Sequence, residues 1–343
     1  MLSRIFLGLA LWCLAITPLR ATEGAFSEDG KTLWMLSRWA NFVLRFRVGE
    51  TAPTRFKIPQ EILSGPYDSE RITMGPDGLL IDGGGKLWSW NPENTKTRPK
   101  ALADLPKDLL ISGITHLNQD PYKGWIVISG WYSTAPGHPG PPTTNSGTLF
   151  ALRPGRDAFQ AVSSGYQTPL TAAPVTTAGR MFYGLAGDLY EGGIKVDPSM
   201  QNDGGSLWGY RIAPMAMITA NARNQGLMDA REIAIAGDKI WAALGKSSAA
   251  LVSAPIPADP VRADFAACLK TQQESLAGIT VLPLAPLVTG EGAPDTVDHL
   301  CSWTGKNGEW KLAFSLDGKT FWLLESGQEK PRQIGVELSI RGK

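Results

Sequence analysis

The sequence predicts an all-β fold made of repeated four-stranded antiparallel units, and three observations support this prediction. Glycine occurs 38 times and proline 25 times in 343 residues, which suits many short strands separated by turns. Apolar runs are joined by turn signals of the Asp-Gly type. A Gly-x-Leu-aromatic run recurs at 85–88, 147–150 (as Gly-Thr-Leu-Phe) and 205–208. Units of roughly 45–60 residues with four strands each indicate a six-bladed β-propeller, with seven blades as the alternative.

The first unit shows the pattern most clearly. Asp29-Gly30 separates two apolar runs, and glycine takes the positive φ that a tight hairpin turn needs. Apolar and polar residues alternate in 43–48, which is typical of a strand with one buried face. The four strands of this unit are expected at 25–27, 31–37, 42–48 and 55–58.

The later units repeat this plan with longer insertions. Pro76-Asp77-Gly78 supplies the first turn of the second unit, and Gly237-Asp238 supplies the first turn of the fifth. Phe265, Leu269 and Leu276 follow a helical spacing, which predicts a short helix that interrupts the fifth unit. A β-sandwich is the alternative fold, but it does not explain the recurring Gly-x-Leu-aromatic run. The five later units are expected at 71–105, 111–164, 174–220, 232–284 and 300–338.

Two segments resemble a known repeat. Residues 25–34 (AFSEDGKTLW) and 313–322 (AFSLDGKTFW) are similar to the strand–Asp-Gly–strand repeat of bacterial TolB-like and YVTN-type propellers. That repeat often has a proline before Asp-Gly, which is kept here only at Pro76. The resemblance covers about a dozen residues in each of two places. It implies the propeller fold of an exported bacterial protein, and a shared fold does not assign a function.

The N-terminus predicts a secretory signal peptide at 1–21, followed by a single domain at 22–343. Arg4 gives a positive start, 5–16 is apolar, and Pro18 ends the apolar run shortly before Ala21. The run is shorter than the roughly 20 residues that span a bilayer, so we expect no membrane span after cleavage. An uncleaved anchor is the alternative. The protein is therefore expected to be periplasmic or secreted.

Removal of the signal peptide changes the charge and the cysteine count. The remaining chain has 31 basic and 32 acidic residues, a net charge of −1, so we expect no nucleic-acid partner. Cys13 is lost with the signal, and Cys268 and Cys301 remain. Two cysteines in an exported chain usually pair, which predicts a disulfide, with two buried free thiols as the alternative.

Two long polar insertions, 132–146 and 187–204, both follow the presumed second strand of their unit. Connections after equivalent strands project from the same face of a propeller, so we expect both loops beside the mouth of the central channel. Long loops inside compact repeats are commonly functional. The side chains expected to bind a ligand or partner there are Trp131, Tyr132, His138, Asp188, Glu191 and Asp203.

Metal binding is a weaker expectation. Carboxylates at the channel mouth suit Ca²⁺ or another divalent metal, and the candidate ligands are Asp82, Asp188 and Glu191. The sequence has no Asp-x-Asp-x-Asp-Gly loop, and none of its three histidines has a second one at zinc-ligand spacing. We therefore expect no cofactor, with a divalent ion as the alternative.

No catalytic motif stands out. The chain lacks a Gly-x-Ser-x-Gly nucleophile elbow and a Cys-x-x-Cys-His haem site. The sequence favours an exported β-propeller that binds a protein or glycan partner in the cell envelope through the face with the two long loops. The alternatives are a metal-dependent, lactonase-like hydrolase with carboxylates at the channel mouth, and a structural role in an envelope assembly.

Overall fold

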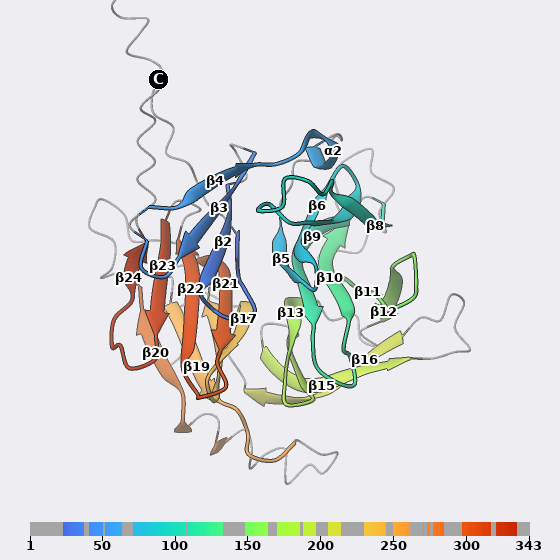
Figure 1. Cartoon of the computed structure of the whole chain (residues 1–343). Helices are drawn as coiled ribbons and strands as arrows, with labels where there is room; N and C mark the ends of the chain where they lie inside the picture. Colours follow the sequence, from blue (N-terminus) through green and yellow to red (C-terminus); the bar gives the residue numbers. More distant parts are fainter. Residues whose placement is uncertain are drawn as a thin grey trace, which may run out of the picture.

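The computed structural model is an all-β structure in which small antiparallel sheets surround a centre (Figure 1). The only short helix with defined bounds is α2 (Gln60–Leu63) in the part of the chain that the structure describes. The described residues are 23–37, 41–50, 52–63, 71–107, 109–132, 148–163, 170–185, 188–196, 205–213, 230–244, 250–260, 270, 273–274, 277–284, 297–316 and 320–334.

The described strands fall into six consecutive groups of four, which we call blades 1 to 6. Blade 1 consists of β1 (Glu23–Phe26), β2 (Thr32–Ser37), β3 (Phe42–Arg47) and β4 (Thr54–Lys57). Blade 2 consists of β5 (Ile72–Gly75), β6 (Gly78–Gly83), β7 (Lys86–Trp90) and β8 (Lys100–Asp104). Blade 3 consists of β9 (Leu109–Leu117), β10 (Trp125–Tyr132), β11 (Thr148–Leu152) and β12 (Gln160–Ser163).

The second half of the chain follows the same order. Blade 4 consists of β13 (Leu170–Thr177), β14 (Arg180–Leu185), β15 (Asp188–Val196) and β16 (Gly205–Ala213). Blade 5 consists of β17 (Ala230–Ala236), β18 (Lys239–Leu244), β19 (Ala250–Pro255) and β20 (Thr280–Pro283). Blade 6 consists of β21 (Val297–Thr304), β22 (Trp310–Leu316), β23 (Thr320–Glu325) and β24 (Arg332–Ile334).

The first strands of the blades form the inner wall of a ring. Each of β1, β5, β9, β13, β17 and β21 contacts the first strand of the next blade, and β21 contacts β1. Blades 3 and 4 are joined further into one eight-stranded sheet by a parallel pairing of β12 with β16. The all-β propeller of four-stranded antiparallel sheets is thus confirmed. The number of blades stays a prediction, because 214–229 and 285–296 lie outside the described residues.

Apolar side chains fill the space between neighbouring blades. Between blades 6 and 1, Met35 of β2 and Phe321 of β23 are fully buried in one cluster. Burying one side chain of this size contributes about 1.5–3 kcal/mol. Gly24 in β1 permits the close packing, because a Cβ at this position would lie 2.9 Å from the Phe321 ring. The core of the propeller therefore lies between blades and is shared by them.

No strand pairing joins blade 6 to blade 1 in the described sheets, so side chains connect them. The indole Nε1 of Trp303 donates a hydrogen bond to the carbonyl of Glu28 at 2.7 Å. The ammonium of Lys311 donates to the carbonyl of Gly30 at 2.7 Å and lies over the Trp303 ring. These contacts hold the predicted Asp29-Gly30 turn, in which Gly30 has the expected positive φ of 65°.

The predicted loop 187–204 is wrong as a single loop. Residues Asp188–Val196 form β15, the third strand of blade 4, and Gly205–Ala213 is the fourth strand and not the third. The glycines that suggested a loop allow close backbone contact inside the sheet. A Cβ at Gly192 would lie 1.8 Å from the carbonyl oxygen of Trp208, so a side chain does not fit.

This correction moves the two long insertions to different faces. Antiparallel strands reverse direction at each connection, so successive connections lie at opposite ends of a blade. We call the end with the second-to-third-strand and blade-to-blade connections the mouth face, and the other end the turn face. β10 ends and β11 begins at the mouth face, whereas β15 ends and β16 begins at the turn face, and 133–147 and 197–204 between them lie outside the described residues. The expectation that both insertions share one face is therefore wrong.

Several expectations fall outside the described residues. These include the signal peptide at 1–21 and Cys268. Cys301 lies in β21 with a free thiol, so the predicted disulfide with Cys268 is not seen. Within the described ranges, no helix combines the length and the apolar character that crossing a membrane requires.

Candidate functional site

Polar side chains converge where the inner strands begin, at the mouth face. We call Glu23, Arg71, Asp82, Glu232 and His299 the channel-mouth cluster. Glu23 is the first residue of β1, and Arg71 directly precedes β5. Glu232 and His299 are the third residues of β17 and β21, and Asp82 is close to the end of β6. Residues from four blades therefore meet because the ring brings their strand ends together.

Glu23 is the centre of this cluster and is only 2 % exposed. Its carboxylate contacts the guanidinium of Arg71, and it lies 3.0 Å from Nδ1 of His299. The backbone N–H of Arg71 donates to the Asp82 carboxylate at 2.8 Å, and Nε of Arg71 donates to the Ile111 carbonyl at 3.3 Å. Arg71 thus connects blade 1 to blades 2 and 3, and His299 connects blade 6 to blade 1.

His299 is buried among groups that favour its charged form. Its Nε2 lies 2.7 Å from the carbonyl of Gly24, and its Nδ1 lies 3.9 Å from the Glu232 carboxylate. The contact between Nδ1 and Glu23 has the distance but not the angle of a hydrogen bond, so we describe it as an ion pair. Burial acts to lower the pKa of His299, but the hydrogen bond with Cys301 and the charge of Glu232 act against it, and the pKa is raised.

The channel-mouth cluster does not fit a divalent metal as it stands. Calcium takes six to eight oxygen ligands, with carboxylates free to turn toward it. Here the Glu23 carboxylate is already neutralised by Arg71, and Asp82 accepts a backbone hydrogen bond. Among the described residues, no three His, Cys, Asp or Glu side chains are grouped so that they could hold a metal ion.

The other predicted metal ligands lie in separate ion pairs in blade 4. Asp188 contacts the guanidinium of Arg211 at 3.3 Å. Glu191 is buried and receives two hydrogen bonds from Arg180, at 2.6 and 2.7 Å. Arg180 also donates to the carbonyl of Pro257 in the connection of blade 5. The structure therefore does not bring Asp82, Asp188 and Glu191 together, and Glu191 has a structural role between two blades.

The remaining predicted binding residues are only partly within the described residues. Trp131 and Tyr132 are the last two residues of β10, so their backbone lies at the mouth face. Their side chains lie outside the described part, as do His138 and Asp203. Their role stays a prediction.

A cleft opens on the turn face between blades 1 and 2, with a volume of about 770 Å³. Pockets of 300–1,000 Å³ are typical of small-ligand sites. Its apolar lining includes Trp34 of β2 and Met74 of β5. Its polar lining includes Lys31, Arg47 and Glu93, which come from the β1–β2 turn, the end of β3 and the β7–β8 connection.

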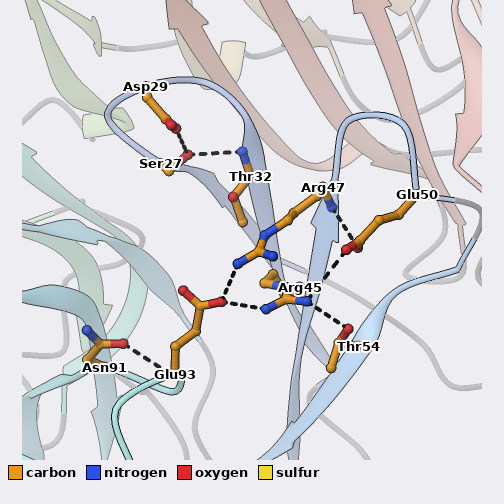
Figure 2. Close-up of polar contacts among 9 residues, drawn as sticks. All are labelled: Ser27, Asp29, Thr32, Arg45, Arg47, Glu50, Thr54, Asn91 and Glu93. Atoms are coloured by element: carbon orange, nitrogen blue, oxygen red, sulfur yellow. Dashed lines mark hydrogen bonds and ion pairs between the residues drawn. The ribbon is translucent and has the colours of Figure 1, made fainter.

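An ion-pair clasp closes the blade boundary beside this cleft. Glu93 of blade 2 reaches across to blade 1, where one carboxylate oxygen, Oε1, lies 2.5 Å from Arg45 and 2.8 Å from Arg47 (Figure 2). Arg45 is held in turn by Thr54 at 3.1 Å and by Glu50 at 3.5 Å. Glu93 itself is 41 % exposed, so the clasp stands in contact with solvent.

Sequence reasoning missed Glu23, Arg71 and Glu232 and the whole clasp. Each missed residue at the mouth is a single charged side chain at the start of an inner strand, and none belongs to a motif. The clasp had a signal, because Arg45 and Arg47 alternate with Leu44 and Phe46 in a strand and therefore share one face. Nothing in the sequence showed that Glu93 faces them.

The comparisons with known proteins support the fold alone. No protein family profile matches the sequence, and no curated protein matches it. Solved β-propellers are similar in structure. A luciferin-regenerating enzyme has a TM-score of 0.53 at 12% identity, covering 88% of this chain and 87% of its own.

Two other solved structures give the same result. The calcium-binding protein regucalcin from Agrobacterium tumefaciens has a TM-score of 0.52 at 10% identity, with 87% of this chain and 83% of that chain covered. A gluconolactonase from Xanthomonas campestris has a TM-score of 0.52 at 11% identity, with 90% and 88% covered. At these identities the likeness extends to the propeller fold, and the predicted resemblance at the level of fold is confirmed.

Proposed function

We propose that this protein is an exported β-propeller that binds a glycan of the cell envelope without catalysing a reaction, and that the cleft between blades 1 and 2 is its binding site. The observation that carries the proposal is the cleft itself, which has a volume of about 770 Å³ and is lined by both apolar and charged side chains. Such a combination suits recognition of a polar molecule with apolar faces. The N-terminal signal features support export.

The position of the cleft favours a glycan over an extended peptide. Peptides are commonly bound by addition of a strand to a free sheet edge, where main-chain hydrogen bonds provide the affinity. This cleft lies at turns and strand ends, between Asp29 on one blade and Gly78 on the next. It therefore offers side chains and turns, and the exposed Val48 supplies an apolar contact for the C–H face of a sugar ring, whereas Trp34 is only 6 % exposed.

A metal-dependent hydrolase is less well supported. The names of two structural neighbours, a calcium-binding protein and a gluconolactonase, raise this alternative. The Glu23 carboxylate, however, is neutralised by Arg71 and His299, and hydrolysis through a metal would need it free. Elemental analysis of the purified protein separates the two functions, since a stoichiometric divalent ion would favour the hydrolase.

A steric block of the cleft tests the proposal. Val48 lines the cleft and is 46 % exposed, so Val48→Trp fills the cleft without disturbing the core. Val281 on β20 is 42 % exposed and does not line the cleft, so Val281→Trp is the matched control. We expect binding on an array of bacterial envelope oligosaccharides to be lost in Val48→Trp and kept in Val281→Trp. Equal binding by both variants would refute the cleft as the site.

A further inference from the structure

We propose that the glycan bound in this cleft carries carboxylate groups, as a polyuronate does, and that Glu93 occupies the place of the ligand carboxylate when the cleft is empty. The inference rests on the proposed function and adds the chemical class of the ligand. Its basis is the geometry of the clasp formed by Arg45, Arg47 and Glu93 (Figure 2).

The two arginines form a site for a carboxylate. Arg45 and Arg47 stand two residues apart on β3 and point from the same side of the strand toward blade 2 (Figure 2). Arg45 is held in position by a hydrogen bond to Thr54. Planar guanidinium groups recognise carboxylates through pairs of parallel hydrogen bonds, which explains their frequency at such sites.

Glu93 makes only some of the hydrogen bonds that the two arginines could form with a carboxylate. Both arginines contact the same oxygen, Oε1, although a carboxylate has two oxygens to offer. Glu93 reaches the arginines from the β7–β8 connection, where its own N–H is bound to the Asn91 side chain, so its approach is limited. A ligand carboxylate that enters from the cleft has no such tether and can present one oxygen to each guanidinium.

Replacement of Glu93 by a ligand carboxylate should cost little free energy. The Glu93 side chain is 41 % exposed and the Arg47 side chain is 49 % exposed, whereas Arg45 is 14 % exposed. Exposed ion pairs of this kind contribute little to stability, because both groups are well solvated when apart. When Glu93 leaves, Arg47 is solvated, and Arg45 keeps its contacts with Glu50 at 3.5 Å and Thr54 at 3.1 Å.

The remaining charged residues that line the cleft are Lys31, Lys311, Glu28 and Asp29. Lys311 is held by the Gly30 carbonyl. The Asp29 carboxylate, which also lines the cleft, is occupied within its own turn by the Ser27 hydroxyl and the Lys31 N–H. The hydrogen bond from Ser27 is the main cause that lowers the pKa of Asp29. Asp29 is thus satisfied locally, and Glu28 is the other acidic side chain of this set beside the two lysines.

Calorimetric titration of the purified protein tests the inference with three probes: a short oligogalacturonate, the neutral galactose oligomer of equal length, and an oligoglutamate peptide. Two substitutions act on the clasp, Arg47→Gln and Glu93→Gln. Their controls are Lys270→Gln and Glu274→Gln, which remove the partners of another exposed ion pair, between β19 and β20, and neither residue lines the cleft. Each variant is also checked for an unchanged unfolding transition.

We expect the oligogalacturonate to bind more tightly than the neutral oligomer. Arg47→Gln should weaken this binding about 10-fold, and Glu93→Gln should strengthen it several-fold, since it removes the internal competitor. Both controls should bind like the wild type. Binding of the oligogalacturonate should also weaken as salt is raised, because the contact is between charges.

Other results would overturn the inference in distinguishable ways. If the neutral oligomer binds equally well and Val48→Trp abolishes it, the proposed glycan function stands and the carboxylate preference is wrong. If Glu93→Gln weakens binding, Glu93 contacts the ligand directly and does not occupy the place of the ligand carboxylate. If only the oligoglutamate binds, the partner is an acidic protein. If no probe binds, neither this ligand class nor the glycan function is supported.

Discussion

The two charged clusters of this propeller use the same residue types in opposite surroundings. In the channel-mouth cluster, Glu23 is 2 % exposed and faces Arg71 and His299. In the clasp, Glu93 is 41 % exposed and faces Arg45 and Arg47. Each carboxylate therefore contacts two basic groups and connects neighbouring blades. The main difference is the exposure of the carboxylate itself, since Arg45 at 14 % and Arg71 at 18 % are similarly buried.

That difference separates a structural role from a binding role. Removing one partner of a buried ion pair leaves an uncompensated charge in a medium that solvates it poorly. An exposed ion pair gains little, because water solvates both groups nearly as well as they solvate each other. The channel mouth is therefore suited to holding the ring together, and the clasp is suited to exchanging partners.

Removal of the buried carboxylate should have the largest effect. Glu23→Ala leaves Arg71 and His299 without their shared partner, and we expect the free energy of unfolding to fall by about 3–5 kcal/mol. Urea denaturation followed by tryptophan fluorescence measures this change. A loss below about 1 kcal/mol would show that the channel-mouth cluster is hydrated and does not differ from the clasp in its contribution to stability.

A change of pH should have the next largest effect, through His299. Its folded-state pKa is raised above the usual value of 6.5, because the contacts with Cys301, Glu232 and Gly24 outweigh burial. The stabilisation by the charged form is therefore complete below pH 6.5 and is lost as pH rises through the folded-state pKa. We expect the midpoint of urea unfolding to fall on going from pH 6 to more alkaline solution.

The variant His299→Gln serves as the control for this pH effect. It removes the titrating group and should flatten the decline in stability above pH 6.5. A decline of equal size in the variant would assign the effect to other groups. A wild type that becomes more stable at alkaline pH would contradict the raised pKa.

Removal of the exposed carboxylate should have the smallest effect on stability. Glu93→Ala breaks both contacts with Arg45 and Arg47, yet we expect the free energy of unfolding to change by less than about 1 kcal/mol. Urea denaturation under the conditions used for Glu23→Ala gives the direct comparison. A loss as large as that of Glu23→Ala would mean that the clasp holds blades 1 and 2 together and is not free to open.

The fold was more predictable than the site, because turn chemistry is local. Asp29-Gly30 and Gly237-Asp238 form the expected turns, with Gly30 and Gly237 both at a φ of 65°. Blade 4 was the exception. The sequence of Asp188–Val196 contains two glycines and two acidic residues, which predicts a loop, but the segment is a strand. Gly192 is required there by close contact with the Trp208 carbonyl, a fact that depends on the neighbouring strand.

The site was less predictable because its residues meet only when the ring closes. Asp82 was identified from its place after an apolar strand, and it does lie in the channel-mouth cluster. Asp188 and Glu191 looked equally suitable, but Arg211 and Arg180 neutralise them. Those partners lie 23 and 11 residues away in the chain, so only strand pairing reveals them.

Because side chains and not strand pairing connect blades 6 and 1, the position of a new chain end in a circular permutant decides whether a sheet is divided. Each described sheet of blades 1, 2, 5 and 6 is built from four strands in unbroken succession, and none borrows a strand from the far end of the chain. A circular permutant that begins at β5 would consequently keep every strand pairing, and Trp303 and Lys311 would still meet the β1–β2 turn. A cut between blades 3 and 4 would instead divide the polypeptide within a single eight-stranded sheet.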